Sequence, residues 1–149
     1  MPIKSFRGLI TSYDSAIPGS GINTISLHTN DGSVGYKIVK FQIMPNNFNE
    51  SDEYNVKIYK TPQTEATTTF DFSDNTMLAA AFIETVSGAA EGVSPVILFD
   101  NEIFNQDIYV TAKSQAAKSI NYYIELEQVK LDLNENTVAT LKDIRNIQS

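Results

Sequence analysis

The sequence predicts an all-β fold: an antiparallel β-sandwich of jelly-roll type, followed by a short C-terminal amphipathic helix. Three observations lead to this prediction. About eight short segments have strand-like composition or alternation, turn residues recur at spacings of about 8–12 residues, and helices do not alternate with strands as a parallel sheet would require. Because the chain has 149 residues and no linker-like stretch, we expect one domain over residues 1–149.

The first third of the chain is expected to hold three strands. Residues 3–10 are the first, and the proline and glycines of residues 15–21 make a turn. Residues 22–29 are the second strand. The Asn-Asp-Gly signal at 30–32 predicts a tight hairpin to the third strand, residues 33–44.

This third strand has apolar side chains on both of its faces. Val39, Phe41 and Ile43 lie on one face, and Tyr36 and Ile38 lie on the other. Such a strand is typical of a position between two layers, so we expect it to be central in the fold.

The middle of the chain is less regular. Residues 53–60 form a strand with alternating apolar positions, and the Thr-rich residues 61–69 form an exposed connection, part of which (67–72) could extend as a strand. Residues 77–84 fit either a helix, because of their alanines, or a strand between two turns. We expect the strand.

The C-terminal third contains the clearest strand. Short β segments are expected at residues 96–99, 102–104 and 107–113. After them, strict alternation puts four apolar side chains on one face: Ile120, Tyr122, Ile124 and Leu126. The other face carries Asn121, Tyr123, Glu125 and Glu127. A two-residue period of this kind indicates a half-buried antiparallel strand.

A short amphipathic helix is expected at about residues 136–147. Asn134 or Asn136 can cap it, and its apolar positions are Val138, Leu141, Ile144 and Ile147. A helix of about three turns is not stable alone. It packs either on its own domain or on a neighbouring subunit, and in the second case these four apolar residues are the candidate assembly interface.

The charge distribution is uneven. The net charge is −7, and residues 61–112 hold eight carboxylates but no Lys or Arg, so they carry −8 and the remainder carries +1. An acidic chain lacks the basic surface that nucleic-acid binding needs. The acidic segment is interpreted either as a solvated face or as a docking surface for a basic partner or a cation.

Catalytic chemistry finds little support in the residues. The absence of Cys removes disulfides, thiol catalysis and thiolate metal sites. His28 is the only histidine, so neither a catalytic triad nor a His-based zinc site is indicated. Glu125 and Glu127 share a strand face, as carboxylates on many solvated strands do. We expect a protein that is not an enzyme and has no cofactor.

Two acidic loops are the candidates for a cation. Carboxylates in loops can ligate calcium, but neither loop has EF-hand spacing, so no metal is predicted. The candidate ligands are Asp71, Asp74, Asp100 and Glu102, with Asn75 and Asn101 beside them.

Three stretches of the sequence resemble a known group of proteins: GYKIVKFQIMPNN at 35–47, LFDNEIFNQDIYVT at 98–111, and the strand-and-helix segment 119–145. Together they resemble small virion structural proteins of tailed bacteriophages, especially marine ones. The phrase INYYIELE, followed by an acidic linker and a TLKDIR-like helix, is the most specific part. The resemblance implies a non-enzymatic particle component and transfers no binding or catalytic residue.

The function expected from the sequence is therefore a structural role on the outside of a phage particle, foremost capsid decoration. The alternatives are a tail, neck or fibre role, or a β-sandwich module that binds a glycan or receptor. Expected partners are other virion proteins, capsid or tail subunits, together with further copies of this chain, and neither nucleic acid nor membrane insertion is expected. No apolar run long enough for a signal peptide is present at the N-terminus, so synthesis in the host cytoplasm is expected.

Overall fold

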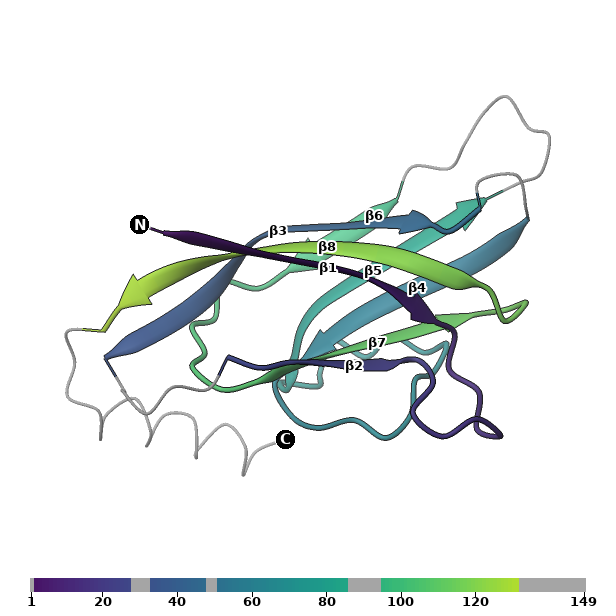
Figure 1. Cartoon of the computed structure of the whole chain (residues 1–149), viewed down its shortest axis with the longest axis horizontal. Coiled ribbons are helices and arrows are strands. Elements are labelled where there is room, and N and C mark those ends of the chain that lie inside the picture. Colours follow the sequence, from purple (N-terminus) through teal and green to yellow (C-terminus); the bar gives the residue numbers. More distant parts are fainter. Residues whose placement is uncertain (1, 28–32, 48–50, 86–94, 132–149) are drawn as a thin grey trace.

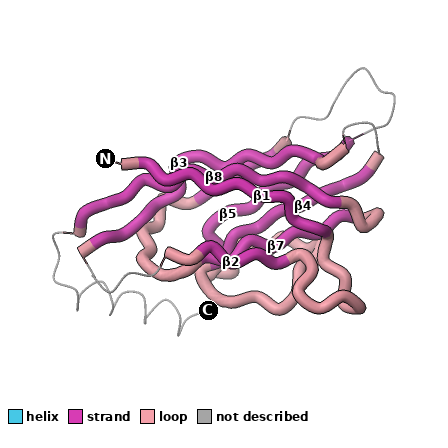
Figure 2. Tube along the Cα trace, in the orientation of Figure 1, coloured by secondary structure: helices cyan, strands magenta, loops and turns pink. Residues whose placement is uncertain are grey.

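The computed structural model describes residues 2–27, 33–47, 51–85 and 95–131. These residues form eight strands in two antiparallel sheets and contain no helix. The three-stranded sheet has the order β1 (Ile3–Thr11), β8 (Ser119–Lys130), β3 (Val34–Pro45). The five-stranded sheet has the order β2 (Ile22–Ile25), β7 (Ile108–Ser114), β4 (Asp52–Tyr59), β5 (Met77–Thr85), β6 (Val96–Phe99). The sheets form two layers (Figure 1), and strands dominate the described trace (Figure 2), so the predicted all-β antiparallel sandwich is confirmed.

The strand pairing is that of a jelly roll, in which one long hairpin is wound around the core. The first strand pairs with the last (β1 with β8), the second with the seventh (β2 with β7), and the fourth with the fifth (β4 with β5). A jelly roll would also pair β3 with β6. Here that pair is reduced to one bridge, between Tyr36 of β3 and Phe104, which follows β6 in the chain. β6 itself pairs with β5 and extends the larger sheet.

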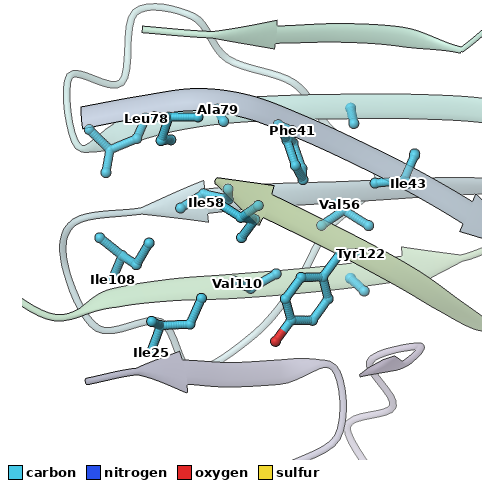
Figure 3. Packing of buried hydrophobic residues seen from close by; sticks show 14 of the residues in the cluster. Ile25, Phe41, Ile43, Val56, Ile58, Leu78, Ala79, Ile108, Val110 and Tyr122 are labelled. Atoms are coloured by element: carbon cyan, nitrogen blue, oxygen red, sulfur yellow. The ribbon is translucent and has the colours of Figure 1, made fainter. Parts of the chain in front are cut away.

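The core lies between the two sheets. The inward side chains of β8 are those expected from its alternation, and Ile124 and Leu126 have no exposed surface. They belong to the same core cluster as Val56 and Ile58 of β4 and Val110 of β7, which Figure 3 labels. β8 is the middle strand of its sheet, which explains why its pattern is the most regular in the chain.

The expectation that the third strand is central was wrong. β3 is an edge strand, paired along its length only with β8. Its apolar side chains on both predicted faces arise from a β-bulge, because the register with β8 shifts between Ile38 and Lys40. The extra residue moves the inward positions from Tyr36 and Ile38 to Phe41 and Ile43, so the core-facing parity changes within one strand.

The hairpin expected between the second and third strands was also wrong. β2 and β3 lie in different sheets, because β2 pairs with β7 and β3 with β8. A tight-turn signal says nothing of which sheet the chain enters next. The turn residues 28–32 themselves, with His28, lie outside the described residues, as does the expected helix at 136–147.

The remaining expectations have mixed outcomes. Residues 77–84 lie in the strand β5, whose three consecutive alanines are buried in the middle of the strand. Residues 67–72 form a loop rather than a strand, and 102–104 contributes only the bridge at Phe104. The described part of the chain includes no helix long and apolar enough to cross a membrane.

Candidate functional site

Exposed apolar side chains gather at one edge of the larger sheet. They are Phe72, Val96, Leu98 and Phe99, which we call the β6 patch. Phe72 is 67% exposed, Val96 56% and Leu98 50%. A hollow of about 590 Å³ opens here, lined by Phe72, Leu98 and Phe99 from the patch and by Met77 of β5. The carboxylate-bearing residues Asp74, Asp100 and Glu102 also line it, so the hollow combines apolar and acidic side chains.

A buried lysine anchors the loop that places Phe72 in this patch. Lys57 of β4 is only 2% exposed, and its ammonium group donates to the carbonyl of Thr67 at 3.2 Å and to the carbonyl of Thr69. The same ammonium lies 4.8 Å from the centre of the Phe70 ring, which meets Phe82 of β5 edge-on. These contacts hold the loop against the outer surface of the sheet.

Burial lowers the pKa of Lys57, because desolvation disfavours the charged form. Among the described residues no carboxylate forms an ion pair with this ammonium. The loop therefore depends on a cation held by carbonyl dipoles and an aromatic ring. The pattern around residue 57 looks like an ordinary strand, so the sequence offered no signal for this contact.

The backbone of β6 is free on one side. Asp100 N–H donates to the carbonyl of Leu78, so the alternation of an antiparallel ladder places the Val96 and Leu98 hydrogen bonds on β5. The N–H and C=O groups of Ile97 and Phe99 then point away from β5. Among the described strands none pairs with this side. β6 is thus an open edge with exposed apolar side chains.

The four candidate metal ligands serve the loops instead. Asp71 accepts hydrogen bonds from Ser73, which lower its pKa, and Asp74 accepts hydrogen bonds from Thr76. The Asp100 carboxylate accepts a hydrogen bond from the Asn101 N–H, and Glu102 accepts one from Lys60 at 2.9 Å. Within the described ranges, no three acidic or histidine side chains come together as a metal site would need.

The paired carboxylates considered at β8 are separately engaged. Glu125 accepts a hydrogen bond from the Tyr123 hydroxyl at 2.7 Å, and the Glu127 carboxylate lies 3.8 Å from the Lys37 ammonium. The structure instead places Glu53 and Glu84 opposite each other on β4 and β5. A hydrogen bond with Glu84, with further contributions from desolvation and from the Glu84 and Asp52 charges, raises the pKa of Glu53. This pair is distant in sequence, and strand pairing alone brings it together.

A second hollow, of about 660 Å³, lies on the outer face of the three-stranded sheet. Register places Leu9 of β1, Asn121 of β8 and Met44 of β3 in one row across this face. The adjoining row consists of Arg7, Tyr123 and Gln42. The hollow thus combines two exposed apolar side chains with an aromatic ring, a guanidinium group and two amides. The candidate interface residues 138, 141, 144 and 147 lie outside the described residues.

No protein-family model matches the chain, and no curated protein sequence matches it. Among solved structures, the Merkel cell polyomavirus protein VP1 in complex with 3'-sialyllactosamine is similar over 85% of this chain and 94% of that chain, with 8% identity and a TM-score of 0.46. The unassembled VP1 pentamer of the same virus gives the same coverage, with 9% identity and a TM-score of 0.44. Likenesses of this size carry no argument about function, so the chemistry of the surfaces must supply one.

Proposed function

We propose that this chain is a non-enzymatic structural protein of a virus particle, most specifically a capsid decoration protein that binds its neighbours through the β6 patch. One observation carries the proposal: four exposed apolar side chains gather at an open sheet edge beside a hollow. Contiguous exposed apolar surface of this kind marks an interaction site. The resemblance of three sequence stretches to phage virion proteins supports the particle role.

The rest of the surface fits a binding rather than a catalytic role. The acids that could have formed a reactive site are engaged with backbone groups, hydroxyl groups or a lysine of the same molecule. A patch confined to one edge and its adjoining loop gives an interface of modest area. Such an interface holds when many copies bind a symmetric shell together.

Particles of the virus that encodes this chain test the proposal. Quantitative mass spectrometry of purified particles should find the chain in a fixed ratio to the shell protein. Replacement Leu98→Asp should remove the chain from particles, because a carboxylate would be buried in the contact. Ile17→Asp is the matched control, since Ile17 is similarly exposed, at 54%, on the loop between β1 and β2.

Both variant chains should keep the thermal unfolding midpoint of the parent, because both side chains are half exposed. Equal incorporation of the Leu98 and Ile17 variants would contradict docking through the β6 patch. A chain that is abundant in the lysate and missing from purified particles would contradict the particle role itself.

The second candidate function is glycan or receptor binding by the hollow on the three-stranded sheet. It is favoured by Tyr123 together with Arg7, Gln42 and Asn121, which supply an aromatic surface and hydrogen-bond donors around an open depression. Binding of the purified protein on a glycan array, lost in Tyr123→Ala and kept in Leu98→Asp, would support it. An array without signal would contradict it.

A further inference from the structure

Two of the four sheet edges have complementary character. The edge strands are β1 and β3 in the three-stranded sheet and β2 and β6 in the five-stranded sheet, and the complementary two are β1 and β6. β1 packs over β7, whereas β3, at the other side of its sheet, packs over β5 and β6. The open edges of β1 and β6 therefore lie at opposite sides of the molecule.

The backbone of β1 is open in the same way as that of β6. Ser12 N–H donates to Lys118 C=O, and Gln128 N–H donates to Pro2 C=O. The alternation of an antiparallel ladder between these two bonds points the backbone N–H and C=O groups of residues 4, 6, 8 and 10 toward β8. The N–H and C=O groups of Ile3, Ser5, Arg7 and Leu9 point outward, and among the described strands none pairs with them.

The side chains of the two edges also match. β1 exposes Ile3 (50%) and Leu9 (53%) on its outer face, as β6 exposes Val96 and Leu98 on its own. Residues 1–11 contain Lys4 and Arg7 and no carboxylate. Asp74 and Asp100 line the hollow beside β6 and belong to the 61–112 segment that has no Lys or Arg. Apolar groups can meet apolar groups while opposite charges face each other.

We propose that the β6 edge binds the β1 edge of a second copy of this chain, joining the two sheets with their outer faces on the same side. This inference rests on the proposed function, because it names the partner of the β6 patch. Self-pairing of two β6 edges would oppose acid to acid, and self-pairing of two β1 edges would oppose base to base. Of these three pairings, only the unlike one satisfies the backbone, the apolar side chains and the charges together.

The pairing is head-to-tail, because each copy uses two different edges. Contacts of this type generate a closed ring when the rotation between copies closes, and a filament when it does not. Each copy then gives its β6 edge and receives a β1 edge, so neither of these two edges stays open inside a ring.

Thiol cross-linking tests the contact directly, because the chain has no cysteine of its own. Leu98→Cys and Ser5→Cys chains, each confirmed to unfold at the parent temperature, are mixed in equal amounts and treated with a short bifunctional thiol reagent. The mixed dimer should make up more than half of all cross-linked dimers, since half is the share that random encounters give. Ser15→Cys, on the exposed loop after β1, is the control partner and should give only the random share.

A random share for the Leu98–Ser5 mixture, or an excess of either homodimer, would overturn the proposal. Charge reversal provides the second measurement. Arg7→Glu or Asp100→Arg, introduced into the cross-linking chains, should each reduce the yield of the Leu98–Ser5 mixed dimer several-fold. Chains that carry both changes should give the original yield again. Failure of the double change to restore pairing would also overturn the proposal.

The particle role is tested separately. A chain found in purified particles but giving only random cross-linking retains the proposed function and loses the head-to-tail contact. A chain that cross-links as expected but is missing from purified particles loses the particle role alone.

Discussion

Single residues determine how the loops of this sandwich are held. Lys57 is the clearest case: a lysine on a central strand is buried, has only carbonyls, a hydroxyl and an aromatic ring around its ammonium, and fixes the loop that carries Phe72. Gly21 is another, since its positive φ of 72° and its contact with the Tyr13 backbone leave no room for a side chain. Lys57 thus positions the loop that carries Phe72, and Gly21 allows the loop before β2 to pack against Tyr13.

The lowered pKa of Lys57 predicts a pH dependence of stability. Between its pKa in the folded chain and the usual value of 10.5, the unfolded chain binds more protons than the folded one. The free energy of unfolding should therefore rise with pH through this range, up to about pH 10. Urea unfolding of wild type and Lys57→Met across this range measures it, and the rise should be absent in the variant.

The upper limit of that range has a physical reason. The pKa of Tyr59 is raised, first by desolvation and then by Asp74 and Asp71, so above about pH 10 the unfolded chain loses the phenol proton first. Stability should fall there in both proteins. An equal rise in wild type and Lys57→Met below about pH 10 would show that another group is responsible.

Two glycines of the loop between β1 and β2 form a matched pair for a second prediction. Gly19 and Gly21 both have positive φ, but a Cβ would meet nothing within 4 Å at Gly19 and would lie 2.5 Å from the Tyr13 Cα at Gly21. Gly19→Ala should cost about 1–2 kcal/mol through backbone strain alone. Gly21→Ala should cost a further ~1–3 kcal/mol through overlap. Thermal unfolding of both variants measures the difference, and equal losses would contradict it.

At the scale of elements, the bulge in β3 decides which side chains reach the core. Tyr36 and Ile38 before the bulge and Phe41 and Ile43 after it are all buried, although they differ in parity. If the same residues formed a regular strand without the bulge, the two halves would present opposite faces to the core. An edge strand tolerates such a bulge because only β8 must keep its register with it.

Deletion of single residues tests this interpretation of β3. Removing Val39 should restore a regular ladder with β8 and keep all four side chains inward, at a cost below about 2 kcal/mol. Removing Lys37 should turn Tyr36 outward and lose the bridge to Phe104, at a cost of about 3–5 kcal/mol. Urea unfolding compares two chains of equal length, and a costlier deletion at 39 would contradict the assigned bulge.

At the scale of the whole molecule, charge and open edges are distributed unevenly. Asp74, Asp100 and Glu102 line the hollow beside β6, whereas β1 carries two cations at the opposite side of the sandwich. Neither the eight strands nor their core requires this asymmetry. It gives the molecule two ends, which suits directional assembly on a shell or ring.

Ionic strength should therefore weaken the contact between copies. The yield of the Leu98–Ser5 cross-link should fall as NaCl rises from about 0.05 M to about 0.5 M, since screening shortens the reach of the charges to a few ångströms. The thermal unfolding midpoint, measured at both salt concentrations, serves as the control for folding. A yield that stays constant would show that charge does not guide the pairing.

The sequence by itself determined most of the strands. Alternation located β8 and β4 closely, and turn residues separated the short strands β6 and β7, because a half-buried strand needs period two and its ends need turn chemistry. The acidic segment was visible in the sequence as well, and so were the residues of the β6 patch. The sequence did not show that these residues lie at an exposed sheet edge, since an edge cannot be recognised without knowing the strand order.

Only the tertiary structure decided which sheet each strand joins, and hence which edges stay open. The hairpin signal at 30–32 and the two-sided pattern of β3 both pointed elsewhere, because strand pairing is chosen by packing between segments far apart in the chain. The contacts of Lys57 with Thr67 and Thr69, and the pairing of Glu53 with Glu84, arise in the same way. Local alternation sets where a strand runs, and burial of both sheets against one core sets its neighbours.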